Sequence, residues 1–177
     1  MGEQLCDSRL LAGTKMVYLK AAEMWIGNKP AVIKTVLGSC VSVTFFHPGS
    51  GLASICHAIQ PRCPRKEKCS QACVHRYRYA DCAIDSIIRQ MQRKGMKKSD
   101  IEVKLFGGAV MIKGKRSVSD ALSVGELNAQ VALETIHRSK LRLKAVNTGG
   151  GVGRKLIFDA ANGEVLMRRL KNSAWTG

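Results

Sequence analysis

The sequence predicts an α+β fold in which mixed, largely antiparallel β-sheets, arranged like a sandwich, pack with two main helices. Three observations predict this class. Short runs rich in β-branched and aromatic residues recur along most of the chain, two longer segments repeat their apolar residues with helical spacing, and Asn162-Gly163 is a strong hairpin signal. Strands therefore outnumber helices.

The first predicted strands lie before residue 60. The first thirty residues are mixed in character and end in turn residues at 27–30, after which residues 31–36 form a β-branched run. Residues 40–46 alternate, stop at the turn residues 47–51 and resume at 52–55. This pattern predicts an antiparallel pair of strands.

Two helices are predicted from apolar spacing. Six apolar residues fall at i, i+3, i+4, i+7, i+8 and i+11 and predict one buried helical face: Ala80, Ala83, Ile84, Ile87, Ile88 and Met91. Gly95 is a plausible stop for this helix. A second helix contains Ala129, Ala132, Leu133 and Ile136, and we expect it to begin between Ser119 and Gly125.

The remaining strands lie in the second half of the chain. Residues 101–106 alternate and run into Gly107-Gly108, residues 141–146 precede a glycine turn at 147–151, and two more strands flank Asn162-Gly163. We interpret the glycine groups mainly as structural turns and leave open that another backbone or a substrate approaches them closely. Asn147 and Thr148 are weak candidates for substrate contact.

Size and apolar content favour one domain over residues 1–177. A chain of 177 residues with 45% apolar residues can line an interior, which excludes disordered and collagen-like classes. No apolar run is long enough for a membrane span, and charged residues early in the chain leave no apolar signal core. We therefore expect a cytoplasmic protein without membrane insertion.

The charge predicts acidic partners. The net charge is +16, and the basic residues gather in two blocks, 61–98 and 138–171. Such a charge also suits nucleic acid, so a basic nucleic-acid-binding module is the alternative from another class. Only 5% of the residues are aromatic and no nucleic-acid-binding motif is present, so we do not expect a nucleic-acid partner.

One cysteine and one histidine are candidates for catalysis. Cys40 follows Gly38-Ser39 at the start of a strand, and His57 ends the next strand, so antiparallel pairing would bring the two together. A neighbouring imidazolium stabilises a thiolate, which is the nucleophilic form of cysteine. The alternatives are a buried cysteine that packs as a small apolar residue and a histidine with an ordinary structural role.

Five segments of the chain resemble, in the same order, those of the CheD family of chemoreceptor glutamine deamidases. They are TVLGSCV at 35–41, CHAIQP at 56–61, YAD at 79–81, FGGA at 106–109 and NTGG at 147–150. Each segment alone is weak, but five in sequence are specific. The resemblance covers about residues 31–170 and sets apart a basic, cysteine-rich insertion at 62–78.

The resemblance implies a cysteine hydrolase that converts glutamine side chains of methyl-accepting chemotaxis receptors to glutamate and in some cases hydrolyses glutamate methyl esters. It implies Cys40 as the nucleophile and His57 as the general base. The family's third catalytic residue is a threonine, for which Thr35 is the nearest candidate, although the family's threonine stands one place earlier, at Lys34 here.

The chemistry expected from these residues proceeds through a thioester on Cys40, with an oxyanion held by backbone N–H groups at Ser39-Cys40 or a nearby glycine turn. It requires no metal or organic cofactor. The expected partners are the cytoplasmic domains of the receptors and a CheC-type phosphatase. A non-catalytic chemotaxis scaffold is a further alternative, which the presence of Cys40 and His57 argues against.

The insertion holds a possible metal-binding set, formed by Cys63, Cys69, Cys73 and His75. Their C-x5-C-x3-C-x-H spacing matches none of the strong zinc patterns, which use closely paired cysteines. We favour a basic loop with free thiols and predict no metal site. Seven cysteines in a chain without an export signal also argue against a disulfide scaffold.

Overall fold

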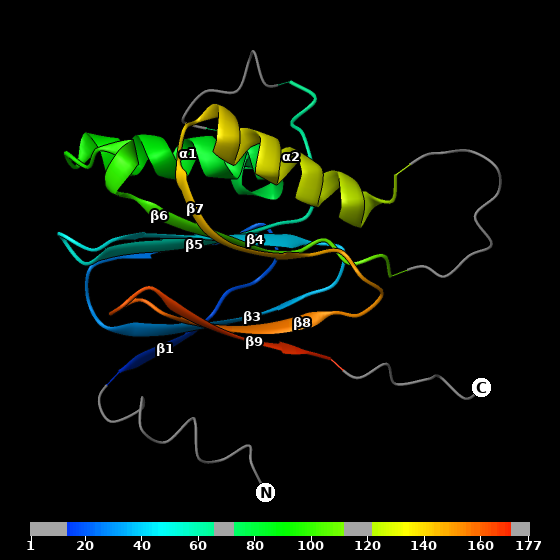
Figure 1. Cartoon of the computed structure of the whole chain (residues 1–177), viewed down its shortest axis with the longest axis horizontal. Coiled ribbons are helices and arrows are strands. Elements are labelled where there is room, and N and C mark those ends of the chain that lie inside the picture. Colours follow the sequence, from blue (N-terminus) through cyan, green and yellow to red (C-terminus); the bar gives the residue numbers. More distant parts are fainter. Residues whose placement is uncertain (1–13, 66–72, 112–121, 171–177) are drawn as a thin grey trace, which may run out of the picture.

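The computed structural model describes residues 14–65, 73–111 and 122–170, which build three layers: two helices, a five-stranded sheet and a four-stranded sheet (Figure 1). The five-stranded sheet is the middle layer, with the helices on one face and the other sheet on the opposite face. The α+β class and the mixed, largely antiparallel sheets are confirmed.

The four-stranded sheet has the order β1-β3-β8-β9. Its strands are β1 (Lys15–Tyr18), β3 (Ala31–Leu37), β8 (Arg154–Asp159) and β9 (Glu164–Arg169). β1 pairs with β3 in parallel, and the other two pairs are antiparallel. The hairpin predicted at Asn162-Gly163 joins β8 to β9, and Gly163 has a φ of 76°, which a glycine adopts at little cost.

The five-stranded sheet has the order β2-β5-β4-β6-β7. Its strands are β2 (Met24–Gly27), β5 (Leu52–Ala58), β4 (Val41–His47), β6 (Glu102–Gly107) and β7 (Arg142–Thr148). The predicted antiparallel pair is β4 with β5, while β6 and β7 are parallel because the second helix forms the crossover between them.

The helices are α1 (Ala80–Arg93) and α2 (Val124–Arg138). α1 carries the predicted apolar face, and Gly95 follows it with a φ of 87°. α2 begins inside the expected window because Ser123 and Glu126 form a capping box at its first turn. Neither helix is long and apolar enough to cross a membrane, as judged over the described residues.

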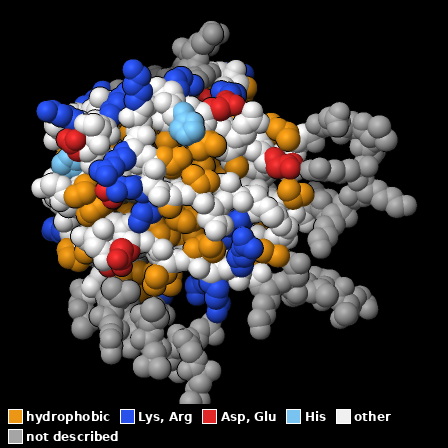
Figure 2. Space-filling view, in the orientation of Figure 1, with side chains coloured by type: hydrophobic (Ala, Val, Ile, Leu, Met, Phe, Trp, Pro, Cys, Tyr) orange, Lys and Arg blue, Asp and Glu red, His pale blue; other side chains and the backbone are white. Residues whose placement is uncertain are grey.

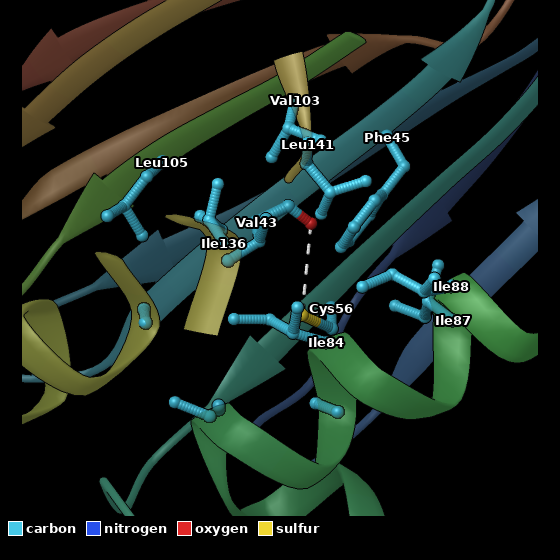
Figure 3. Packing of buried hydrophobic residues seen from close by; sticks show 14 of the residues in the cluster. Val43, Phe45, Cys56, Ile84, Ile87, Ile88, Val103, Leu105, Ile136 and Leu141 are labelled. Carbon is cyan, nitrogen blue, oxygen red and sulfur yellow. Dashed lines mark hydrogen bonds between the residues drawn. The ribbon is translucent and has the colours of Figure 1, made fainter. Parts of the chain in front are cut away.

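The main core lies between the helices and the sheet. Alternate residues of β4 and β5 face α1 there, among them Val43, Phe45 and Cys56, which pack with Ile84 and Ile87 (Figure 3). Cys56 is fully buried, and its thiol lies 3.8 Å from the carbonyl oxygen of Val43. On this face the cysteine packs as an apolar residue.

β1 and β2 were not predicted. Each has only four residues, and each lies at the edge of its sheet, so neither shows a long apolar alternation. Pairing with β3 and with β5 forms these strands. They matter for the site because the chain between them lies beside His57, as described below.

The connection from β3 to β4 crosses from one sheet to the other. Leu37 ends β3 in the four-stranded sheet, Val41 begins β4 in the five-stranded sheet, and only residues 38–40 join them. Cys40 therefore lies where the chain passes between the layers.

Candidate active site

Cys40 is half-buried at the edge of the space between the two sheets. Its side chain packs against a small apolar cluster formed by Leu37, Phe106 and Leu156. Leu37 and Leu156 belong to the four-stranded sheet, so the Cys40 side chain faces the layer opposite its own strand. The thiol is partly accessible, unlike that of Cys56.

The backbone around Cys40 is held by its neighbours. The carbonyl oxygen of Gly38 accepts a hydrogen bond from the N–H of Ala109 at 2.9 Å, and that of Cys40 accepts one from Gly108 at 2.8 Å. Gly107 has a φ of 109°, and a Cβ there would overlap the Cys40 carbonyl oxygen. At Gly107 the close approach of another backbone, one of the two interpretations left open from the sequence, is what the structure shows.

His57 lies on β5 directly opposite Ser42 of β4. Because Cys40 is two residues before Ser42, it is a diagonal neighbour of His57, and such neighbours have Cα atoms about 7–8 Å apart. The His57 ring contacts Thr35 of the four-stranded sheet, and Cys40 contacts Leu37 of the same sheet. Both side chains therefore face the space between the sheets.

Thr35 fixes the tautomer of His57. The hydroxyl of Thr35 donates to the carbonyl oxygen of Leu19 at 2.9 Å and lies 2.9 Å from Nδ1 of His57. Since a hydroxyl has one hydrogen, which is used on Leu19, its oxygen accepts from Nδ1–H of the imidazole. The lone pair of the neutral ring is consequently on Nε2.

Both candidate groups favour their uncharged forms. Burial lowers the pKa of His57 below its ordinary value, an effect opposed in part by the Leu19 carbonyl and by the charge of Glu23. Burial raises the pKa of the Cys40 thiol, and the backbone N–H of Cys40 opposes the rise. The resting site thus holds a thiol and a neutral imidazole, not the thiolate and imidazolium of the sequence-based argument.

Nε2 of His57 is buried and has no hydrogen-bond partner among the described residues, so no hydrogen bond joins it to the Cys40 thiol. Buried polar atoms without partners are rare in folded proteins and mark sites that a substrate or water completes. Catalytic hydrogen bonds also shorten when substrate binds. The arrangement is that of a base whose accepting atom is unused in the free protein.

Sequence reasoning missed three groups around the site: the carbonyl oxygen of Leu19, the amide of Asn128 and the guanidinium of Arg154. Asn128 is fully buried on α2, and its Nδ2 donates to the carbonyl oxygens of Ser39 and Ile59 at 2.9 and 3.2 Å. A polar residue on the apolar stripe of the predicted helix was the available signal.

Arg154 holds the glycine turn after β7. It is 1% exposed, and it donates to Oδ1 of Asn147 at 2.9 Å and to the carbonyl oxygen of Gly149 at 2.8 Å. Asn147 therefore supports a buried cation, a different role from the substrate contact considered from the sequence. Its signal was a basic residue at an inward position of an alternating strand.

The possible metal ligands are partly described. Cys63, Cys73 and His75 belong to no group of three or more metal-ligating side chains within the described ranges, and Cys69 lies outside them. The backbone N–H of Cys63 donates to the carboxylate of Asp81 at 3.1 Å, which ties the start of the insertion to the first turn of α1.

Comparisons with known proteins agree with the segments noted in the sequence. A family model described as "CheD chemotactic sensory transduction" matches residues 63–169, a span that contains both helices but begins after Cys40 and His57. Relatives also align over the part of the chain that holds these two residues, because the alignments cover nearly nine-tenths of it.

Three relatives share this extent. A probable chemoreceptor glutamine deamidase CheD from Maridesulfovibrio salexigens is 36% identical over 158 residues, 89% of this chain and 93% of the relative. Probable deamidases from Geobacter sulfurreducens, CheD 2, and from Pseudomonas syringae pv. tomato are 38% and 35% identical, covering 89% and 88% of this chain and 91% and 90% of the relatives. The chain belongs to the CheD family.

Proposed function

We propose that this protein hydrolyses the side-chain amide of glutamine residues on the cytoplasmic domains of chemoreceptors, with Cys40 as nucleophile and His57 as general base. The names of the relatives support the substrate class. The observation that carries the residue assignment is the neutral His57 ring, held at Nδ1 by Thr35 and unpartnered at Nε2, in the space that Cys40 also faces.

In the first half of the reaction, Nε2 of His57 takes the proton of the Cys40 thiol as Sγ forms a bond to the carboxamide carbon. The imidazolium then returns this proton to the amide nitrogen. The C–N bond breaks, ammonia leaves, and the glutamyl group remains on Cys40 as a thioester.

In the second half, water replaces ammonia. Nε2 takes a proton from the water as its oxygen attacks the thioester carbon, and the C–S bond breaks with return of that proton to sulfur. The products are glutamate and a regenerated thiol, so one water is consumed and one ammonia is released for each turnover.

Both halves pass through an oxyanion that needs hydrogen-bond donors. The backbone N–H groups of Ser39 and Cys40 are the nearest in sequence, and among the loop and turn hydrogen bonds of the described residues neither donates to a protein acceptor. Donors of this kind stabilise the charge that develops on the carbonyl oxygen.

The surface charge supports an acidic protein partner. Arg76, Arg89 and Arg93 line a hollow of about 240 Å³ beside α1. On the face seen in Figure 2, Lys and Arg side chains stand in several groups among apolar side chains, with few acidic ones between them. A partner helix with acidic and apolar residues fits such a mixed surface.

The test is incubation of the full chain with receptor cytoplasmic fragments that carry glutamine at defined positions. We expect ammonia release together with the mass gain of an amide converted to an acid, and incorporation of oxygen-18 from labelled water into the new carboxylate. Hydroxylamine added during turnover should trap the thioester as a hydroxamate.

Cys40→Ala should abolish all three signals with the fold intact, while Cys56→Ala, a change at a fully buried thiol on the other sheet face, should keep them. Activity retained without the Cys40 thiol would reject the assignment. Salt-dependent binding to duplex DNA without any deamidation would favour the nucleic-acid-binding alternative.

A further inference from the structure

Asn128 joins the two segments that carry the proposed catalytic residues. Its Nδ2 donates to the carbonyl oxygen of Ser39, directly before Cys40, and to that of Ile59, two residues after His57. One side-chain amide therefore ties the sheet-crossing connection to the end of β5.

The chemistry of the contacts fixes the orientation of this amide. Both neighbours are carbonyl oxygens, which only accept, so the NH2 group of Asn128 must face them. Its Oδ1 is then left buried without a hydrogen-bond partner among the described residues. An unpaired buried oxygen costs stability, so the gain from this asparagine lies in the two carbonyls that it holds.

Holding the Ser39 carbonyl also orients the N–H of Cys40. The two groups belong to one peptide unit, which is trans, so they point in opposite directions. Since the Ser39 carbonyl points to Asn128 on α2, the Cys40 N–H points away from that helix. The Gly38 carbonyl is likewise held by Ala109, which turns the N–H of Ser39 away from residues 107–109.

α2 reaches this position because its first turn lies directly on the backbone after β6. A Cβ on Gly125 would overlap the carbonyl oxygen of Ala109, so only glycine allows the approach. The capping box of Ser123 and Glu126 fixes where the helix begins, and Asn128 follows one turn later.

We propose that Asn128 is a positioning residue that holds the Ser39–Cys40 peptide with its N–H directed at the oxyanion of the reaction. The inference rests on the proposed function for its chemical consequence. Its structural part, the orientation of the peptide by Asn128, stands on the hydrogen bonds alone.

The test compares the full-length wild type with Asn128→Ala and Asn128→Asp, neither of which can donate the two hydrogen bonds. Thr135→Val is the matched control, since Thr135 is also fully buried on α2 but bonds only to Val131 of the same helix. For each protein we would measure kcat and KM on a receptor fragment, the rate of Cys40 alkylation by iodoacetamide, the melting temperature and the Cys40 amide resonance by NMR.

We expect kcat to fall about 10- to 100-fold in either Asn128 variant with KM nearly unchanged, because a misaligned oxyanion donor affects the transition state. Alkylation by iodoacetamide forms no oxyanion, so its rate should stay within about twofold. The Cys40 amide resonance should move in both Asn128 variants and stay in place in Thr135→Val.

An unchanged kcat in a folded Asn128 variant would overturn the proposal. So would a parallel loss of kcat, alkylation rate and melting temperature that Thr135→Val reproduces, because that pattern reports a structural role only. A wild type without deamidase activity would reject the proposed function and the oxyanion role with it, while an unmoved amide resonance would reject the orientation of the peptide by Asn128.

Discussion

The two faces of the five-stranded sheet differ in what they bury. Cys56 and His57 are consecutive, yet Cys56 points into the apolar layer under the helices, and His57 points into the space between the sheets. On the helix side, burial raises the pKa of the Cys56 thiol to about 12. On the other side, Thr35, Ser42 and His57 are buried polar groups. The comparison teaches that residue type alone does not make a reactive cysteine; the layer that it faces does.

The largest expected effect separates the two faces by activity. His57→Gln should lower kcat/KM on a receptor fragment by about 10²- to 10⁴-fold, because it removes the proposed base. Cys56→Ala should keep kcat/KM within about threefold and cost about 1 kcal/mol in urea unfolding, since it only leaves a small cavity. Comparable loss of activity in both variants would break the comparison.

The thiols should differ next in reactivity. Cys40 is half-buried, whereas Cys56 is fully buried with a pKa of about 12. In the native protein at pH 8 we expect iodoacetamide to modify Cys40 at least about 100-fold faster than Cys56, because only the thiolate reacts and only Cys40 is reached. Peptide mapping over time gives both rates. Similar rates would mean that the helix-covered face opens readily.

A smaller effect concerns the support of the imidazole. Thr35→Val keeps the shape of the side chain but removes the acceptor for Nδ1–H of His57. We expect kcat to fall about tenfold, because the ring is no longer held in one tautomer. Thr44→Val is the matched control, another buried threonine on the neighbouring β4. Equal kcat values for the two variants would remove Thr35 from the proposed site.

The smallest effects are on the pH dependence of stability. Since burial lowers the pKa of His57 below 6.5, the unfolded chain binds the proton first, and the free energy of unfolding should decline as the pH falls below that value. The raised pKa of Cys56 acts in the opposite range, so stability should decline as the pH rises from 9 toward 12.

His57→Gln should flatten the acid decline and Cys56→Ala the alkaline one, each by at most about 1.4 kcal/mol per pH unit. Cys40, whose pKa is also raised, keeps part of the alkaline decline in the second variant. Urea unfolding across pH measures both slopes, and unchanged slopes in the variants would show that these groups titrate alike in the folded and unfolded chains.

Much of the fold followed from periodicity, and the rest depended on tertiary partners. The buried face of α1 and the strands β3 to β9 repeat their apolar residues, so their local pattern was sufficient. β1 and β2 are four-residue edge strands that only pairing defines. No pattern within residues 15–27 distinguishes them from loop.

The site divides in the same way. Convergence of the segments of Cys40 and His57 followed from one hairpin, β4 with β5, whose register the turn at residues 47–51 sets. The contacts of Leu19, Asn128 and Arg154 are different, because each joins segments from separate elements. Such contacts depend on how the layers are stacked, which a single sequence does not encode in any local spacing.

The hydroxyl of Thr35 is anchored to Leu19, a residue just beyond the short parallel strand β1. Shortening the protein from its amino end, or fusing a bulky tag there, would disturb the imidazole without touching a residue that reacts. Assays of this enzyme are therefore best made with the amino end unaltered and any affinity tag at the carboxyl end.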